Sequence, residues 1–276
     1  MSCTDRIGIV AAVSGFLAQH RMWIVDAKHH ADPDTGRFFM RQEVLADSSP
    51  FGLEELRRQF EPIRQKFEMS CTIIDSDELK RVVILVSRQA HCLDDLLYRL
   101  RSGEMPFDLR AVISNHDDSR AFVEWHKVPF HQVPTDGTNK DAAFREIDRI
   151  LQQCEPDVIV LARYMRILPP WLCEKYPGKI INIHHSFLPS FVGSRPYHQA
   201  HDRGVKYVGA TCHFVTQELD QGPIIEQDAF RTNHADTIDE LVRMGRDVEK
   251  AVLARGLRYC LENRVLLNGR KTVVFD

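Results

Sequence analysis

The sequence has no long hydrophobic run. No apolar stretch of the 276-residue chain approaches the roughly 20 residues of a membrane-spanning helix, and the N-terminus does not read as a basic segment followed by an apolar one. The net charge is −3, so the chain also lacks the basic excess that binding to nucleic acid or anionic membranes requires. We therefore expect a cytoplasmic protein with no nucleic-acid partner and no membrane partner.

Cysteine spacings typical of metal sites or disulfide frameworks are also missing. The seven cysteines are odd in number and widely scattered, without a Cys-x-x-Cys pair. Histidines are adjacent at His29-His30 and at His184-His185, but neighbours in a strand point to opposite faces and cannot easily share one ion. We expect no metal requirement.

The chain is long enough for two domains with cores of their own, since 43% of its residues are hydrophobic. In its first part, apolar spacing and turn residues predict helices at 7–19 and 52–67, and strands at 22–28, 38–45 and 71–74. Asp5 is the expected cap of the first helix. This order is that of a βαββαβ unit whose first strand is cut short, because only Met1 to Cys3 precede the first turn.

After a hinge at about 75–80, strands and helices alternate. Strands are expected at 81–87, 109–114 and 158–161, helices at 91–101, 118–126, 141–154 and 237–261, and a closing hairpin at 265–266 and 272–275. Alternation of this kind predicts a mainly parallel sheet flanked by helices.

Polar residues that suit acyl transfer follow one buried strand. Residues 180–189 read Ile-Ile-Asn-Ile-His-His-Ser-Phe-Leu-Pro, so Asn182 and His184 share one face at the carboxyl end of a strand, where α/β sheets bind ligands. Asp220 lies in the later turn Leu-Asp-Gln-Gly-Pro. An amide and an imidazole can stabilise an oxyanion, while the carboxylate can keep the imidazole charged or take a proton from water.

These motifs resemble the folate-dependent formyltransferases, whose active sites carry Asn-x-His followed by Asp-x-Gly-Pro. Most transferases of that family have proline after the histidine, and His185 in that place is similar to the formyltetrahydrofolate deformylases. Segments 161–168, 194–200 and 245–250 support the resemblance, which covers nearly the whole chain. It implies hydrolysis of 10-formyltetrahydrofolate to formate and tetrahydrofolate, supplying formate for purine synthesis and balancing the one-carbon pool. Asn182, His184 and Asp220 would be the catalytic residues.

The same resemblance implies where the folate binds. The substrate-binding residues would be Met165, Arg166, Ile167, Leu168, His185, Val215 and Gly222. His185 either positions the attacking water or packs where relatives have proline, and Arg166 and Arg195 are candidates for contact with the glutamate tail. No cofactor is expected, because 10-formyltetrahydrofolate is the substrate.

The first strand-to-helix turn of the second domain has no glycine. It reads Ser-Arg-Gln-Ala-His-Cys from Ser87 to Cys92, whereas a phosphate-binding turn needs glycines so that backbone N–H groups can approach the anion. Transferases that formylate glycinamide ribonucleotide resemble this fold but have a glycine-rich loop here, so water is the expected nucleophile. Arg88 or His91 either lines the vacant acceptor pocket or caps the following helix.

The N-terminal part resembles the ACT domain in its element order and in the turn Asp-Arg-Ile-Gly from Asp5 to Gly8. It departs from that pattern in its first strand, which looks truncated, and at Thr4 and Ile7, where prolines are frequent. The resemblance implies an amino-acid effector such as glycine or methionine near Asp5 and Gly8, and a homodimer or homotetramer.

The predicted fold class is thus α/β: an N-terminal ferredoxin-like (ACT) α+β domain over 1–76, then a Rossmann-like, mostly parallel-sheet formyltransferase domain over 81–276. Two other functions stay open. A formyltransferase acting on an amine or tRNA is disfavoured by the turn without glycine, the missing basic appendage and His185. A noncatalytic folate or amino-acid sensor is disfavoured by the intact set of Asn182, His184 and Asp220.

Overall fold

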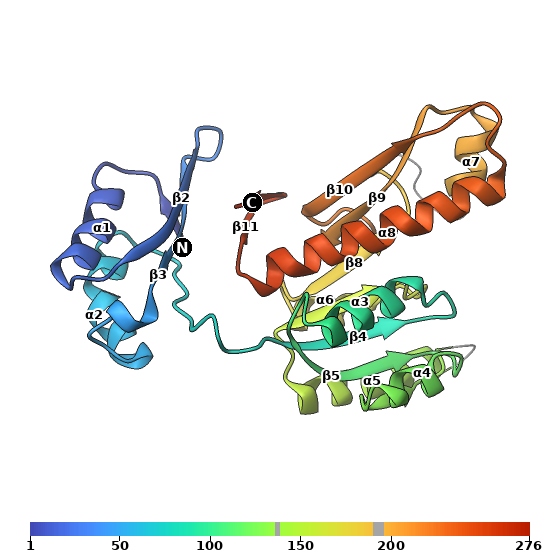
Figure 1. Cartoon of the computed structure of the whole chain (residues 1–276), viewed down its shortest axis with the longest axis horizontal. Coiled ribbons are helices and arrows are strands. Elements are labelled where there is room, and N and C mark those ends of the chain that lie inside the picture. The colour runs from blue at the N-terminus through green and yellow to red at the C-terminus, as the bar shows by residue number, and fades with distance from the viewer. Residues whose placement is uncertain (136–138, 190–195) are drawn as a thin grey trace. The chain divides into compact units, whose positions relative to one another are not determined.

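The computed structural model describes residues 1–135, 139–189 and 196–276, and its contacts divide the chain into two units (Figure 1). Unit 1 contains Met1–Glu78, Asn263–Asn268 and Val273–Asp276, and unit 2 contains Leu79–Glu262 and Gly269–Thr272. The division falls inside the predicted linker. Unit 1 also includes C-terminal residues, which the predicted ranges of 1–76 and 81–276 had placed in the second domain. The sequence did not indicate this, because contacts between distant parts of a chain leave no local pattern.

Unit 1 is a small α+β unit. Its antiparallel sheet has the order β1 (Ser2–Thr4), β3 (Arg37–Val44), β2 (Ile24–Asp32), and its helices are α1 (Ile9–Gln19), α2 (Leu53–Lys66) and the short 3₁₀ helix η1 (Ala46–Ser48). One hydrophobic core joins the sheet to both long helices, with the Phe16 and Phe60 rings edge to face at a centroid distance of 5.4 Å. The expected α+β class is confirmed.

Two local expectations for unit 1 were wrong. The cap of α1 is Gly8, in the left-handed conformation at φ 96°, and the backbone N–H of Asp5 instead donates to Gly36. Residues 71–74 are not a strand: Ser70 forms a single antiparallel bridge with Ser2, since β1 is too short to pair with more of that segment.

Unit 2 is built on a seven-stranded sheet with the order β10-β9-β8-β7-β4-β5-β6. The strands are β4 (Arg81–Val86), β5 (Asp108–Ser114), β6 (Phe130–Gln132), β7 (Val158–Ala162), β8 (Ile180–His184), β9 (Tyr207–Phe214) and β10 (Ile224–Arg231). Neighbours from β6 to β8 are parallel, whereas β9 and β10 are antiparallel to their neighbours. The predicted mostly parallel sheet is therefore confirmed.

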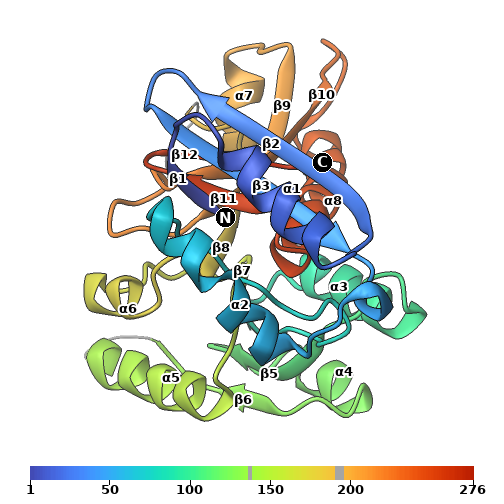
Figure 2. The same cartoon turned by 90° about the vertical axis from the view of Figure 1, so that its left-hand side faces the viewer.

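Helices cover both faces of this sheet (Figure 2). On one side lie α5 (Lys140–Cys154) and α6 (Pro170–Lys175), and on the other lie α3 (His91–Ser102), α4 (Arg120–Trp125) and α8 (Ile238–Leu261). The short α7 (Pro196–Asp202) contacts α8. Val83 and Leu85 of β4 face α5, where they pack with Phe144 and Ile147. Because side chains alternate along a strand, Val82 and Ile84 point toward the other helical layer.

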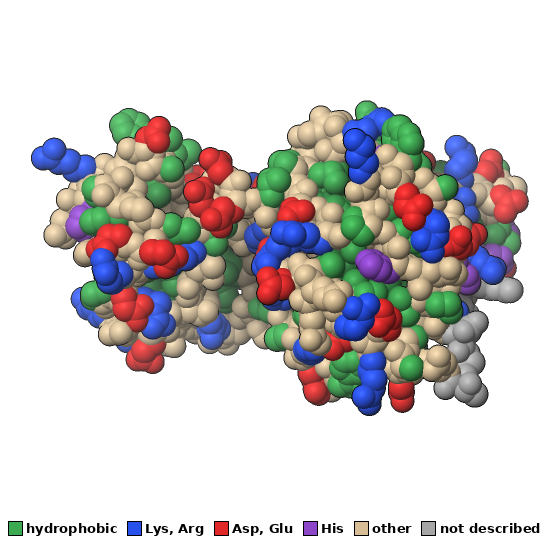
Figure 3. All heavy atoms as spheres, turned by 90° about the horizontal axis from the view of Figure 1, so that it is seen from below, with side chains coloured by type: hydrophobic (Ala, Val, Ile, Leu, Met, Phe, Trp, Pro, Cys, Tyr) green, Lys and Arg blue, Asp and Glu red, His purple; other side chains and the backbone are tan. Residues whose placement is uncertain are grey.

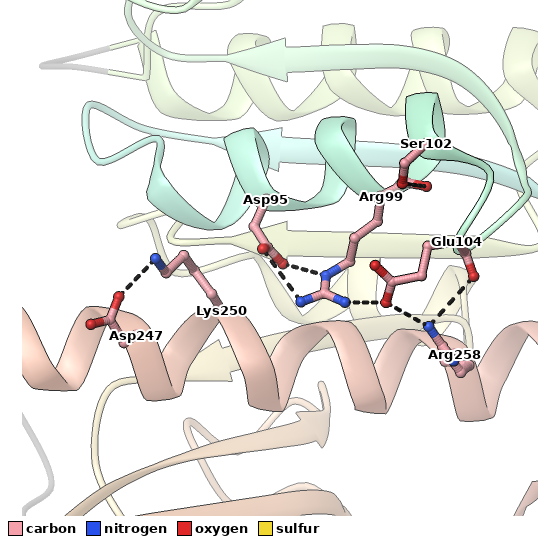
Figure 4. A network of polar contacts seen from close by, with 7 residues as sticks. All are labelled: Asp95, Arg99, Ser102, Glu104, Asp247, Lys250 and Arg258. Carbon is pink, nitrogen blue, oxygen red and sulfur yellow. Dashed lines mark hydrogen bonds and ion pairs between the residues drawn. The ribbon is translucent and has the colours of Figure 1, made fainter.

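A polar network joins α3 to α8 (Figure 4). Arg99 of α3 contacts Asp95 at 2.7 Å and also pairs with Glu104, whose carboxylate accepts a bond of 3.0 Å from Arg258 of α8. Partly exposed ion pairs contribute little each, about 0–1 kcal/mol. The contacts join the two helices through Glu104, which pairs with both Arg99 and Arg258.

The chain ends in a two-stranded sheet of β11 (Val265–Asn268) and β12 (Lys271–Val274), which confirms the predicted hairpin. The Asn268 amide, buried within unit 1, donates to Asp32 of β2 at 2.5 Å. This bond links the last strands to the first sheet.

The described helices include none that is long and apolar enough to cross a membrane. On the face drawn in Figure 3, acidic and basic side chains are interspersed over each unit. The described residues of that face therefore form no continuous basic stripe of the kind that tracks nucleic acid.

Candidate active site

Asn182 lies within β8, with a neighbouring strand on each side. It stands opposite Leu161 of β7 and His213 of β9, and its Nδ2 lies 3.2 Å from Nε2 of His213. Nδ1 of His213 lies 2.8 Å from the carbonyl oxygen of Phe214, so that nitrogen carries the proton and Nε2 accepts from Asn182. The contact sets the orientation of the Asn182 amide, which has a second N–H for a ligand.

His184 and Asp220 lie beside Asn182. His184 is two residues further along β8, on the same face, and its Nδ1 is 3.4 Å from Oδ1 of Asp220. The same carboxylate oxygen is 3.9 Å from Nε2 of His213. The structure thus brings the three predicted catalytic residues together, and it adds His213, which the sequence analysis did not single out.

The turn that carries Asp220 is held against the end of β9. Asp220 has φ 56°, in the left-handed region that costs a non-glycine residue of order 1 kcal/mol. A Cβ on Gly222 would lie 1.7 Å from the carbonyl oxygen of Phe214. This contact accounts for the glycine by main-chain packing, and the predicted contact of Gly222 with substrate stays a prediction.

Burial and neighbouring groups shift the pKa values of Asp220 and His213. Burial acts to raise the pKa of Asp220, but its hydrogen bond to His184 and its electrostatic interactions with His184 and His213 outweigh burial and lower that pKa. Burial lowers the pKa of His213. At neutral pH the cluster therefore holds an ionised carboxylate beside a neutral His213, which agrees with the acceptor role of His213 toward Asn182.

One atom of the cluster lacks a protein partner. Nε2 of His184 is buried, yet it has no hydrogen-bond partner among the described residues. Leaving such an atom unpaired costs about 1–3 kcal/mol. Because Asp220 aligns the ring from Nδ1, Nε2 and the second N–H of Asn182 are suited to bind a ligand oxygen.

The predicted folate-binding loop follows β7 at the same edge of the sheet. The backbone N–H of Met165 donates to Oγ of Ser87 at 3.1 Å, and that hydroxyl donates to Asn115 Oδ1 at 2.7 Å. The loop is therefore tied to the ends of β4 and β5. Its Met165 and Ile167 side chains are 54% and 69% exposed.

Other predicted substrate-binding residues have packing roles. Leu168 is buried in the core shared with α5, and Val215 packs on the same core while its N–H donates to Ile180 at 2.9 Å. Arg166 is exposed and bonds to Thr135 Oγ1 at 3.0 Å. Arg195 lies outside the described residues.

A second buried cluster adjoins the first, and the sequence analysis did not predict it. Glu249 of α8, 1% exposed, accepts from Tyr197 at 2.7 Å, contacts Nε2 of His91 at 2.7 Å and lies 3.4 Å from Nε of Arg163. A Cβ on Gly245, one turn earlier, would lie 2.1 Å from the Tyr197 hydroxyl. The sequence signal that could have revealed this cluster is Glu249, a carboxylate on the apolar face of the predicted helix.

His185 has ring contacts with a residue of each cluster. Its ring stacks on that of His184 at 5.2 Å and is tilted toward that of Tyr197 at 6.3 Å. Burial, followed by the charge of Arg163, lowers the pKa of His185 to about 3. The ring is therefore neutral at physiological pH and has one nitrogen that accepts hydrogen bonds.

The first strand-to-helix turn bears on the predicted capping of α3, while the lining of an acceptor pocket by Arg88 or His91 stays a prediction. His91 binds Glu249 rather than capping α3, whose N-cap residue Ala90 makes no side-chain capping bond, and Arg88 is exposed. His91, Cys92 and Glu249 place their ligand atoms within 4.8 Å of one another. Arg163 beside Glu249 disfavours a cation there, and burial raises the pKa of Cys92 well above its usual value. The expected lack of a metal stays a prediction.

The predicted effector residues lie at the turn between β1 and α1 of unit 1. Asp5 is exposed and Gly8 accepts a bond from the N–H of Ala12. These contacts describe the turn without testing an effector role.

Comparison with known proteins gives one consistent result. The formyl transferase family model matches residues 80–257. The chain is 44% identical over 274 residues to a formyltetrahydrofolate deformylase of Corynebacterium sp. (strain P-1), covering 99% of this chain and 96% of that protein. It is also 43% identical to a formyltetrahydrofolate deformylase of Bacillus subtilis (strain 168), covering 100% of this chain and 92% of that protein. A crystal structure of a formyltetrahydrofolate deformylase from Pseudomonas syringae pv. tomato matches at a TM-score of 0.98 and 58% identity, covering 100% of this chain and 92% of that one.

Proposed function

Because this chain belongs to the formyltetrahydrofolate deformylases, we propose that Asn182, His184 and Asp220 perform its reaction, the hydrolysis of 10-formyltetrahydrofolate to formate and tetrahydrofolate. The observation that carries the assignment is the buried Nε2 of His184, which no described residue satisfies. It lies in a cluster that supplies both an oxyanion donor and a proton acceptor.

In this mechanism, water attacks the formyl carbon and a C–O bond forms. The oxyanion accepts from the free N–H of Asn182 and from Nε2–H of His184 in its imidazolium form. Asp220, ionised and 12% exposed, helps to take the proton of the water. The C–N10 bond then breaks, N10 receives a proton through His184 or Asp220, and formate and tetrahydrofolate leave.

Water is the proposed acceptor of the formyl group, because the first strand-to-helix turn of unit 2 offers no binding site for a phosphorylated amine. Two of its side chains are used internally: His91 binds Glu249, and Oε1 of Gln89 accepts from Arg163 Nη2 at 2.8 Å and from Arg163 Nε at 3.2 Å. None of the six residues of this turn is glycine, so no backbone cradle for a phosphate follows β4.

For the pterin ring, we assign binding to the main chain of the loop from Met165 to Leu168 and of the segment from Val215 to Gly222. Both are fixed to the sheet, by Ser87 and by Ile180, which gives the rigid donors and acceptors that an amide-like ring edge needs. Exposed Met165 and Ile167 offer apolar surface to the ring, and Arg166 is placed for the glutamate tail.

The wider role is proposed on the same basis. The protein acts in the cytoplasm, needs no cofactor, supplies formate for purine synthesis and balances the one-carbon pool. Unit 1 binds glycine or methionine near Asp5 and Gly8 in a homodimer or homotetramer. Turnover that changes on titration of either amino acid would support this regulation, and turnover unaffected by both would contradict it.

The decisive experiment incubates the protein with 10-formyltetrahydrofolate and no acceptor, and measures formate and tetrahydrofolate together. We expect equal release of both products. Asn182→Ala removes an oxyanion donor and should lower turnover roughly 10²- to 10³-fold. Asp220→Asn should lower it at least as far, because the substitution removes the proton acceptor and the charge beside His184.

Matched substitutions elsewhere in unit 2 serve as controls. Asn233→Ala changes an exposed loop, and Asp228→Asn changes a carboxylate paired with Arg255 at 2.8 Å. Both should keep turnover near that of the unaltered protein. Folded Asn182→Ala or Asp220→Asn protein with full turnover would remove the assignment, and turnover only after addition of an amine would indicate a transferase.

A further inference from the structure

The strand order of the unit 2 sheet reverses between β4 and β7. From β4 the chain first adds β5 and β6 on one side, and it then returns to add β7 and β8 on the other. The connecting helices α3 and α5 accordingly lie on opposite faces of the sheet (Figure 2). In sheets of this kind, small ligands bind at the carboxyl ends of the two strands where the order reverses. The ends of β4 and β7 are therefore where this fold would receive a second reactant.

Side chains from both of these strand ends meet at this position. Arg163 is the first residue after β7, and Gln89 lies in the turn after β4. Oε1 of Gln89 accepts from Nη2 of Arg163 at 2.8 Å and from Nε at 3.2 Å. Arg163 is 7% exposed and has φ 61°, a conformation that persists at a non-glycine residue only where its surroundings impose it. A buried and firmly held side chain thus bridges the two strand ends.

Glu249 holds this bridge from α8. Its carboxylate, 1% exposed, lies 3.4 Å from Nε of Arg163 and contacts His91 and Tyr197 at 2.7 Å each. Burial acts to raise the pKa of Glu249, but its hydrogen bonds and its interaction with Arg163 outweigh burial and lower that pKa. A Cβ on Gly245 would lie 2.1 Å from the Tyr197 hydroxyl, so this side of the cluster is closely packed. The bridge is therefore half of a buried ion pair.

The bridge also lies next to the candidate catalytic residues. The register of the parallel strands β7 and β8 places Leu161 opposite Asn182. Arg163 and His184, each two residues later, therefore come at the same level at the ends of neighbouring strands. A reactant that entered between β4 and β7 would reach the formyl group from the side that Arg163 occupies.

We propose that Arg163, bridged to Gln89 and held by Glu249, closes the acceptor side of the active site to amines and so keeps water as the nucleophile. The inference rests on the proposed hydrolysis at the catalytic cluster. An amine that entered here would have to displace a guanidinium that makes two hydrogen bonds and an ion pair. The carboxylate of Glu249 would then be left buried and unpaired, which is strongly unfavourable. Water is far smaller and does not require this displacement.

The test removes the bridge and offers an amine. In Arg163→Gly/Glu249→Gln both charges are lost together, so neither is left buried and unpaired, and glycine suits the left-handed backbone at residue 163. The protein is incubated with 10-formyltetrahydrofolate and glycinamide at about pH 8, where an α-amino group is partly neutral. Attack by the amine on the formyl carbon forms a new C–N bond and breaks the C–N10 bond. The amine proton passes to N10, and the products are N-formylglycinamide and tetrahydrofolate.

The two formyl products distinguish a closed acceptor side from an open one. The unaltered protein should release formate and no N-formylglycinamide at any amine concentration. The double variant should form N-formylglycinamide, in a ratio to formate that rises with amine concentration and is at least roughly tenfold above that of the unaltered protein. Arg149→Ala/Glu146→Gln removes an exposed ion pair of α5, 2.6 Å long, and should behave like the unaltered protein.

Gln89→Ala provides a second test that leaves the buried ion pair intact. It removes one anchor of Arg163 and should give N-formylglycinamide in smaller yield than the double variant. Formylation of glycinamide by the unaltered protein would overturn the proposal. So would the absence of N-formylglycinamide with the folded double variant or, where that variant does not fold, with Gln89→Ala. Failure of the proposed hydrolysis is a different result, in which the unaltered protein releases no formate when the amine is omitted.

Discussion

At the scale of single residues, Gly222 lies so close to the main chain of β9 that no side chain fits. The Cβ in Gly222→Ala would meet the Phe214 carbonyl oxygen at 1.7 Å, so the turn carrying Asp220 must move. We expect turnover to fall at least roughly a hundredfold, with a loss of about 1–3 kcal/mol in the free energy of unfolding. Steady-state kinetics and urea unfolding measure the two effects. Gly15→Ala, in open space on α1, is the control and should be neutral or stabilising.

His185 should make the protein sensitive to acid. Its pKa is about 3 in the folded protein, against 6.5 for a free histidine side chain, so the unfolded chain binds more protons between these values. Stability is therefore retained above pH 6.5 and lost as the pH falls, by about 2 kcal/mol at pH 5. Urea unfolding at pH 7 and pH 5 should show a smaller loss for His185→Asn. The exposed His234→Asn control should behave like the unaltered protein, and equal losses in all three would contradict the prediction.

A site residue could be predicted from the sequence where local strand and turn patterns place it, but not where its role depends on contacts with distant parts of the chain. Asn182 and His184 share one strand end, and Asp220 follows the next strand of the sheet, so alternation and turn position identified them. His213 was hidden in an apolar run, because its partner Asn182 is fixed only by strand register. Arg163 was read as part of a motif, but its contact with Glu249 arises only when α8 packs on the sheet.

At the scale of elements, α8 depends on its first turn. The hydroxyl of Thr237 accepts from the N–H of Glu240, and the Glu240 carboxylate accepts from the N–H of Thr237. Thr237→Ala should lower the free energy of unfolding by about 1 kcal/mol and leave kcat unchanged, because the cap is an exposed feature of the helix end. Thermal unfolding and product release measure these quantities. Thr237→Ser retains the hydroxyl and is the control, and a stability equal to that of Thr237→Ala would contradict the capping account.

Long elements were easier to predict than short ones. The apolar periodicity of α3, α5 and α8 and the β-branched runs of β4 and β7 gave their positions to within about two residues. The three-residue β6 and the six-residue α6 are too short for a period to show. Residues 71–74 have strand composition but lack a partner strand long enough to pair with.

At the scale of the whole molecule, the chain ends belong to one unit. Asn268 donates to the buried Asp32 carboxylate, which also accepts from the N–H of Asp34. Asn268→Ala should therefore lower the free energy of unfolding of unit 1 by about 1–3 kcal/mol, while hydrolysis under native conditions is retained. Urea unfolding followed by Trp23 fluorescence would report on unit 1, and Asn233→Ala in unit 2 is the control. Unchanged unfolding of Asn268→Ala would show that this bond adds nothing to stability.

The placement of residues 263–268 and 273–276 in unit 1 also bears on how the protein is made. A ribosome adds about 5–20 residues per second, so residues 79–262 are synthesised over roughly 10–40 s after residue 78 and before the last strands exist. Throughout that interval the N-terminal sheet lacks the Asn268 amide that binds Asp32. The nascent N-terminal unit is thus incomplete until residue 268 has been added, and a chain that stalls earlier leaves Asp32 without its Asn268 partner.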